Sequence, residues 1–181
     1  MRTRFILTAA CAGMFLSGWA VLTAAQQGAT DAPASRPNSK PASSPAEAPA
    51  KWLTSHAKAS EQAKASNRLI LADFTGSDWC IWCKRLKAEV FDTQEFKDWA
   101  AKNVVLLELD FPQQKPQDTA TKKQNAKLAK EYNIRGYPTV LFLKSDGEVV
   151  GQSGYMKGGP KAWVANAQKI VDKAVNRSDK P

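Results

Sequence analysis

Cys80 and Cys83, separated by two residues, are the side chains whose type and spacing most directly suggest chemistry. They lie in the stretch FTGSDWCIWCKRLK, residues 74–87, which is basic and amphipathic after the second cysteine. A pair of this spacing can bind a metal ion, crosslink the fold, or exchange electrons with a disulfide of another protein. The remainder of the sequence must distinguish these three uses.

The cysteine count argues against crosslinking and against a metal site. Of three cysteines, Cys11 lies in an N-terminal leader, so Cys80 and Cys83 are the pair left in the exported part. Their disulfide would close a very small ring, which removes little chain entropy from the unfolded state. A structural zinc site takes four Cys or His ligands, but the exported part adds only His56, which we expect to be exposed on a helix. We therefore expect no metal and no other cofactor; a zinc site shared across a dimer is the alternative.

The N-terminus has the pattern of an export signal. Arg2 and Arg4 precede an apolar stretch over residues 5–22, and small residues follow it. We predict a signal peptide over residues 1–25 that is cleaved near its end. An uncleaved membrane anchor and lipidation of Cys11 are the alternatives. All three interpretations export the domain.

Composition then divides the remainder and limits its partners. Residues 26–50 are rich in Ala, Ser and Pro and are predicted to be a disordered linker. A folded domain is predicted over 51–176, followed by a flexible tail over 177–181. The net charge is +9, and removing the two leader arginines leaves 9 − 2 = +7. Because the basic residues are scattered singly, we expect a solvated basic surface and no nucleic-acid binding.

Helix-like and apolar segments alternate along the domain and predict an α/β fold. Their order is α-β-α-β-α-β-β-α, which favours a mixed sheet with helices on both faces. The last two strands are joined by Ser145-Asp146-Gly147, a hairpin turn pattern. The predicted helices are 51–68, 80–102, 122–133 and 159–175, and the predicted strands are 69–74, 104–111, 139–144 and 148–152.

This order places Cys80 after a strand and at the beginning of a helix. Unpaired backbone N–H groups and the helix dipole stabilise a thiolate there. Lys84 and Arg85 add to this stabilisation, whereas Asp78 opposes it. The thiolate is the nucleophile of disulfide exchange, and such surroundings lower the pKa of a cysteine. Cys83, one turn further on, can then attack the mixed disulfide formed by Cys80, which completes a two-step exchange cycle.

Three motifs in order resemble the thioredoxin-like family. LADFTGSDWCIWCK (71–84) is similar to the family's strand and active-site segment, and YNIRGYPTVLFL (132–143) to its second signature. DGEVVGQSGY (146–155) resembles the closing hairpin, with Gly154 at the place of a late glycine. The resemblance covers about residues 51–175 and implies a thioredoxin-like fold, with a central mixed β-sheet flanked by helices on both faces. TGSDWC is similar to exported bacterial members, which implies the bacterial periplasm. The residues of the first motif that match family positions are Asp73, Trp79, Cys80, Cys83 and Lys84.

The resemblance also implies roles for single residues. Pro138 would follow a cis peptide bond, and Tyr137 would present an extended substrate beside Cys80; an ordinary trans proline is the alternative. Asp73 would lie buried beneath the pair, with a raised pKa, and carry the proton of Cys83. A hydrogen-bonded carboxylate facing the turn is the alternative for Asp73. The predicted substrate contacts are Trp79, Ile81, Trp82, Tyr137 and Pro138.

Departures from the family leave the direction of electron flow open. Ile81 and Trp82 replace the Gly-Pro or Pro-His that stand between the cysteines of better-known members. One residue is added in TGSD (75–78), and the loop 111–121 is longer than usual.

Our hypothesis is an exported, monomeric thiol–disulfide oxidoreductase that reduces protein disulfides. Its partners would be protein substrates that carry a disulfide or thiols, and a membrane disulfide reductase would supply electrons. A non-catalytic binding or chaperone module on the same scaffold is one alternative. A copper(I)-handling protein is another, because two thiolates can hold that ion.

Overall fold

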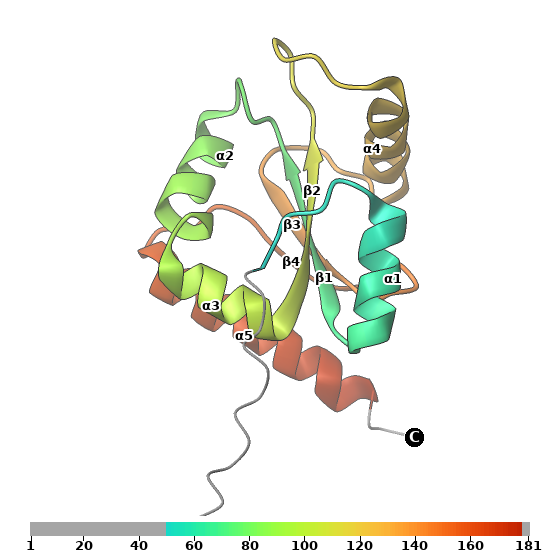
Figure 1. Cartoon of the computed structure of the whole chain (residues 1–181). Helices are drawn as coiled ribbons and strands as arrows, with labels where there is room; N and C mark the ends of the chain where they lie inside the picture. Colours follow the sequence, from blue (N-terminus) through green and yellow to red (C-terminus); the bar gives the residue numbers. More distant parts are fainter. Residues whose placement is uncertain (1–49, 179–181) are drawn as a thin grey trace, which may run out of the picture. The chain divides into compact units, whose positions relative to one another are not determined.

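A computed structural model describes residues 50–178, so the predicted signal peptide, nearly all of the predicted linker and the end of the tail lie outside the described residues. The described chain forms one mixed sheet with helices on both faces, as predicted (Figure 1). The elements are α1 (His56–Ser66), β1 (Leu69–Thr75), α2 (Ile81–Leu86), the π-helical turn η1 (Lys87–Phe91), α3 (Gln94–Asn103), β2 (Val104–Asp110), α4 (Thr119–Glu131), β3 (Thr139–Leu143), β4 (Val149–Ser153) and α5 (Gly159–Ser178).

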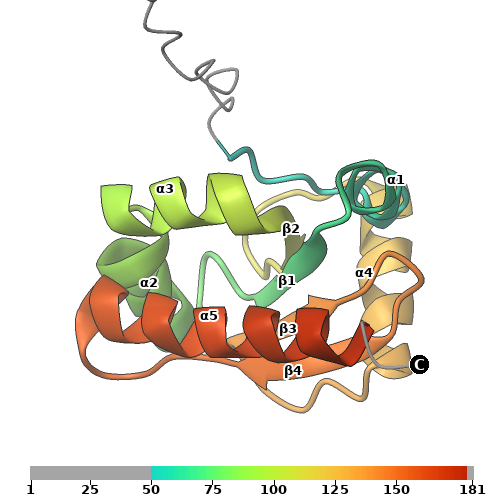
Figure 2. The same cartoon turned by 90° about the horizontal axis from the view of Figure 1, so that it is seen from below.

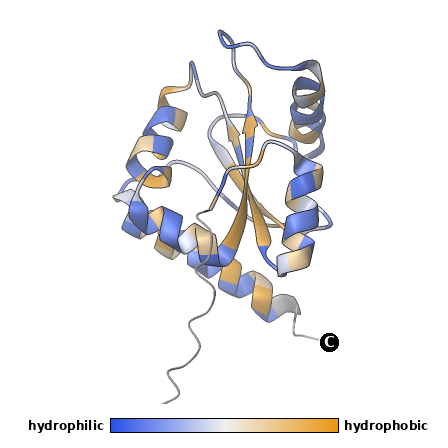
Figure 3. Cartoon of the chain, viewed as in Figure 1, coloured by the Kyte–Doolittle hydropathy of each residue, from blue (hydrophilic) through white to orange (hydrophobic). Residues whose placement is uncertain are grey.

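The sheet has the strand order β2-β1-β3-β4. β1 and β2 run parallel, as expected for two strands joined by a helical crossover, and the other neighbours are antiparallel. The two central strands are buried on both faces, and Figure 3 shows the centre of the sheet as strongly hydrophobic. The active-site segment therefore begins at the end of a rigid central strand.

Side chains of β1 alternate between two cores. Leu71 packs against the helices α2, α3 and α5 with the turn η1, whereas Ile70, Ala72 and Phe74 pack against α1 and α4. Figures 1 and 2 show these two groups of helices on opposite sides of the sheet. The same alternation places Asp73 on the side of Leu71, beneath α2.

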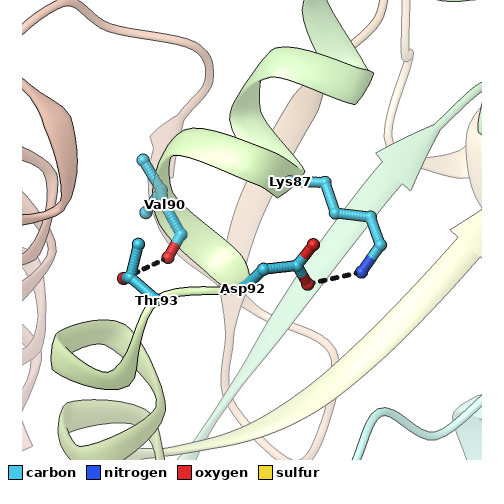
Figure 4. A network of polar contacts seen from close by, with 4 residues as sticks. All are labelled: Lys87, Val90, Asp92 and Thr93. Atoms are coloured by element: carbon cyan, nitrogen blue, oxygen red, sulfur yellow. Dashed lines mark hydrogen bonds and ion pairs between the residues drawn. The ribbon is translucent and has the colours of Figure 1, made fainter.

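The helix predicted over 80–102 is wrong as a single element. α2 passes into η1, which ends at Phe91, and α3 begins anew at Gln94. Thr93 makes the break, because its hydroxyl donates to the Val90 carbonyl at 2.6 Å (Figure 4). As the N-cap of α3, the same hydroxyl accepts the backbone N–H of Phe96 at 3.4 Å. Apolar periodicity continues across both helices, which is why the sequence suggests one.

The helix predicted over 51–68 begins too early. Leu53 is extended and bridges Leu107 of β2, with its N–H donating to Leu106 at 2.9 Å, so residues 51–55 lie along the sheet edge. α1 starts at His56, and this histidine is half-buried rather than exposed. Burial lowers its pKa, and its backbone N–H donates to Gln124 Oε1 at 3.0 Å.

The remaining boundaries shift by a few residues. Asp118 caps α4, so this helix starts at Thr119 and shortens the loop predicted over 111–121 to residues 111–118. α5 reaches Ser178, two residues into the segment predicted as a tail.

Candidate active site

The cysteine pair lies where the sequence places it, at the junction of β1 and α2. Cys80 and Cys83 form a disulfide with Cα atoms 5.3 Å apart. Cys80 is the N-cap of α2, and its Sγ accepts the backbone N–H of Cys83 at 3.1 Å. A donor and a helix N-terminus aimed at this sulfur stabilise it as a thiolate once the disulfide opens.

The two sulfurs have different surroundings on the inner side of the domain. Both residues are nearly buried, Cys80 at 6% and Cys83 at 4% exposure. Cys83 lines a cavity of about 180 Å³, whereas Cys80 is not part of its lining. The polar side chains that line this cavity belong to Asp73, Thr75, Ser77, Lys84, Lys87 and Glu108. A proton leaving Cys83 therefore meets polar groups, not the hydrophobic core.

Asp73 lies in β1 beneath the pair and not in the turn. Its Oδ1 is buried and has no hydrogen-bond partner among the described residues. Burial raises the pKa of Asp73 to about 8, and Glu108 and Asp110 add to the rise while Lys87 opposes it. A carboxyl group that titrates near neutral pH, in the same cavity as Cys83, is suited to proton transfer.

Glu108 is a cavity residue that the sequence analysis missed. The parallel register pairs it with Asp73 across β1 and β2. Burial raises its pKa, and Asp110 raises it further, whereas Lys87 and Lys115 lower it. It is one of two acidic residues in the strand predicted over 104–111, and the sequence does not reveal which residue of the neighbouring strand lies opposite it.

Lys87 is the second residue that the sequence analysis missed. It begins the π-helical turn and lines the cavity, and its ammonium forms an ion pair with Asp92 at 2.7 Å (Figure 4). Both members of this pair are more than half exposed, so the pair adds little stability. The ammonium instead matters as the positive charge that lowers the pKa of the two cavity carboxyls.

The outer side of the disulfide is apolar and exposed. Trp79, Ile81 and Trp82 are 39%, 60% and 47% exposed, although large apolar side chains are usually buried. Trp82 packs on Tyr155 with ring centroids 5.0 Å apart, and the guanidinium of Arg85 lies 5.1 Å from the Trp82 ring centre.

The predicted second signature meets this outer side. The Tyr137–Pro138 peptide bond is cis, as the resemblance implies. Trp79 makes an edge-on contact with Tyr137, with centroids 5.7 Å apart. Because β1 pairs with β3 at Phe74 and Thr139, Pro138 lies next to the carboxyl end of β1. Trp79 therefore contacts Tyr137 beside Pro138, and the binding of substrate by these residues stays a prediction.

Asp78, expected only to oppose the Cys80 thiolate, holds a loop. Its carboxylate accepts the backbone N–H groups of Gln113 at 3.1 Å, Gln114 at 2.7 Å and Lys115 at 3.0 Å. Desolvation raises the pKa of Asp78, but these hydrogen bonds outweigh it and hold that pKa below the ordinary value. The Lys84 ammonium donates to the Asp78 carbonyl at 2.7 Å.

Comparison with known proteins agrees with this geometry. Residues 57–167 match a family model described as a thioredoxin-like domain. The chain is 32% identical over 117 residues to the disulfide bond reductase DsbH of Chlamydia pneumoniae, covering 65% of this chain and 70% of that protein. A solved structure titled DsbH oxidoreductase matches with a TM-score of 0.66 and 31% identity, over 77% of this chain and 96% of that one.

A more distant similarity covers a small part of a larger protein. The thiol:disulfide interchange protein DsbD of Klebsiella pneumoniae is 31% identical over 86 residues, 48% of this chain but 13% of that protein. Within residues 50–178, no helix is long and apolar enough to cross a bilayer. The same residues contain no group of three or more His, Cys, Asp or Glu side chains placed to hold a metal ion.

Proposed function

The chain belongs to the thioredoxin-like family and is a protein-disulfide oxidoreductase, and on this premise we propose that it is exported and reduces disulfides of other exported proteins. The observation that carries the proposal is the asymmetry of the pair. Cys80 caps a helix beside the exposed aromatic surface, whereas Cys83 shares a cavity with Asp73. This asymmetry supports a role for Cys80 in meeting the partner and for Cys83 in losing a proton.

The proposed reaction has two steps. The Cys80 thiolate attacks one sulfur of the substrate disulfide, so a mixed disulfide forms and the other substrate sulfur leaves as a thiolate. Asp73 then accepts the proton of the Cys83 thiol, and the Cys83 thiolate attacks Cys80 Sγ. This releases the second substrate thiol and forms the Cys80–Cys83 disulfide, with two electrons passed to the substrate.

The substrate would lie extended beside Tyr137 and Pro138, with Trp79, Ile81 and Trp82 as its apolar surroundings. Pro138 lies next to the carboxyl end of β1, where a partner strand would pair with the backbone of Tyr137. Export rests on the leader over residues 1–25, and the periplasm is the compartment proposed. A membrane disulfide reductase would return electrons to the pair.

The reducing direction is supported by the name of the relative DsbH, a disulfide bond reductase. It is tested by the reduction potential of the Cys80–Cys83 couple, titrated on the full chain against glutathione. A value near that of thioredoxin, about −270 mV, would agree with a reductase. A value near about −120 mV would make the protein a disulfide donor and overturn the proposed direction.

A further inference from the structure

The three residues before Cys80 each bind the end of β2 or the segment that follows it. Ser77 donates from its backbone N–H and its hydroxyl to the two carboxylate oxygens of Asp110, at 2.9 and 2.6 Å. The Trp79 indole N–H donates to the Phe111 carbonyl at 2.9 Å, and Asp78 accepts from three successive residues of the β2–α4 loop (residues 111–118). The active-site turn and this loop are therefore one hydrogen-bonded unit.

The loop is also connected to the proposed substrate-presenting residue. Phe111 contacts Tyr137 with ring centroids 5.2 Å apart, and Tyr137 contacts Trp79. A polypeptide that lies along Tyr137 and reaches Cys80 therefore passes Trp79, the residue that anchors the loop. The side chains of Gln113, Gln114 and Lys115 are exposed at this place.

The position of Asp78 is unfavourable for the chemistry alone. A carboxylate two residues before Cys80 disfavours the thiolate, because like charges repel. Three backbone N–H donors surround that carboxylate and form a concave anion site. A carboxylate at this position is expected if holding the loop in one shape is of more use to the protein than removing the repulsion between Asp78 and the Cys80 thiolate.

We propose that the β2–α4 loop, held by Asp78, is a recognition surface for an extended polypeptide segment next to the substrate disulfide. Gln113 and Gln114 each carry a primary amide that both donates and accepts hydrogen bonds, which matches the alternating N–H and C=O groups of an extended backbone. The loop is thus a specificity element and Asp78 its positioning residue. This inference rests on the proposed reductase function. It adds that the β2–α4 loop makes the active site selective for protein disulfides over small disulfides.

The test compares two disulfides reduced by the same full-length protein, which is reduced beforehand with dithiothreitol and then separated from it. Insulin is the protein probe, and 5,5′-dithiobis(2-nitrobenzoic acid) is a small probe that is too short to reach the loop. The measured quantity is the ratio of the second-order rate constant at which the reduced protein reacts with insulin to the rate constant at which it reacts with the small disulfide. A Gln113→Ala/Gln114→Ala double variant should lower this ratio about tenfold, the loss expected for two or so hydrogen bonds. Gln62→Ala, an exposed glutamine on α1, is the matched control and should leave the ratio unchanged.

Asp78→Ala adds a readout that a general loss of folding cannot reproduce. It should lower the ratio at least as much as the double variant, and should raise the reactivity of Cys80 toward the small disulfide, because a neighbouring negative charge is removed. Asp78→Asn keeps one acceptor oxygen and should recover part of the ratio.

Unchanged ratios in the double variant and in Asp78→Ala, with an active wild type, would overturn the inference and leave the proposed function intact. An equal loss with both disulfides would also overturn it, since the loop would then only support the active-site turn. A wild-type protein that reduces neither disulfide would overturn the proposed function together with the inference.

Discussion

On the inner side of the disulfide, Cys83 shares a cavity with the buried carboxyl of Asp73 and the half-buried carboxyl of Glu108, whereas on the outer side large apolar side chains are exposed to solvent. Each side departs from ordinary burial in the opposite sense, because charged groups are normally outside and large apolar groups inside. Both departures lower stability when taken alone. Because both departures meet at one disulfide, we propose that proton transfer takes place beneath the pair and partner binding above it.

The largest effect on activity should come from replacing the two cysteines one at a time. Cys80→Ser should abolish reduction of insulin, by at least about a thousandfold, because the attacking thiolate is lost. Cys83→Ser should instead form a mixed disulfide that persists, visible by mass spectrometry and on a non-reducing gel. Val175→Ser, at an exposed residue of α5, is the control for effects of preparing a serine variant.

This pair of variants also separates the alternative functions. Retained insulin reduction in Cys80→Ser would contradict the mechanism. Unchanged partner binding in the double Cys80→Ser/Cys83→Ser protein would favour a binding module, and stoichiometric copper(I) on the reduced wild type would favour metal handling.

The second largest effect should come from replacing Asp73, the carboxyl beneath Cys83. Asp73→Asn should slow the second step of exchange about a hundredfold, since the asparagine amide cannot accept the proton. With the pKa of Asp73 at about 8, the wild-type rate of this step should rise with pH up to that value, and the variant should lose this rise. Stopped-flow measurement of mixed-disulfide decay between pH 6 and about 9 checks this. A variant that keeps the wild-type pH profile would exclude Asp73 as the proton acceptor.

The same carboxyl should make the oxidised protein less stable as pH rises. Its pKa is about 8 when folded and near 4 when unfolded, so between these values the native state binds more protons than the unfolded state. The free energy of unfolding therefore falls from about pH 4 to about pH 8. Asp73→Asn should remove most of this fall and be more stable than the wild type at pH 8, by a few kcal/mol. Urea unfolding at several pH values measures it, and equal slopes for both proteins would contradict the assignment.

Substituting the charged neighbours of Asp73 should cause smaller changes, seen as shifts of the pH at which the exchange rate rises. Glu108→Gln removes a like charge and should lower the pKa of Asp73, moving the rise of the exchange rate to lower pH. Lys87→Gln removes the opposite charge and should raise the pKa of Asp73, so the rise of the exchange rate should move to higher pH. Glu95→Gln, on the exposed first turn of α3, should change neither the pKa of Asp73 nor the pH at which the exchange rate rises. Shifts of the same sign in the two cavity variants would show that packing, and not charge, is responsible.

The smallest effect is expected on the outer side. Trp82→Ala should lower kcat/KM for insulin severalfold, because exposed apolar surface beside Cys80 is lost. The pH profile assigned to Asp73 should not change, since Trp82 does not line the cavity. Val175→Ala, an equally exposed apolar residue on α5, is the matched control. A changed pH profile in Trp82→Ala would show that the two sides of the disulfide are not independent.

Local patterns explain how much of the fold was predictable. Apolar runs such as Leu69 to Phe74 are bounded by turn residues, so each strand was recognised from a few neighbouring residues. The break between η1 and α3 was missed because apolar periodicity continues through Thr93. The extended start of the domain was missed because Leu53 is held by β2, more than fifty residues away in the sequence.

The sequence by itself determined the redox pair, its place before a helix, and the three motifs that resemble the thioredoxin-like family. These depend on residues close together along the chain. Only the tertiary structure decided that Glu108 lies beside Asp73 and that Asp78 holds residues 113–115. The physical reason is that the register of two parallel strands and the path of the loop between β2 and α4 are set by packing across the sheet, and neither is encoded in the spacing of neighbouring residues.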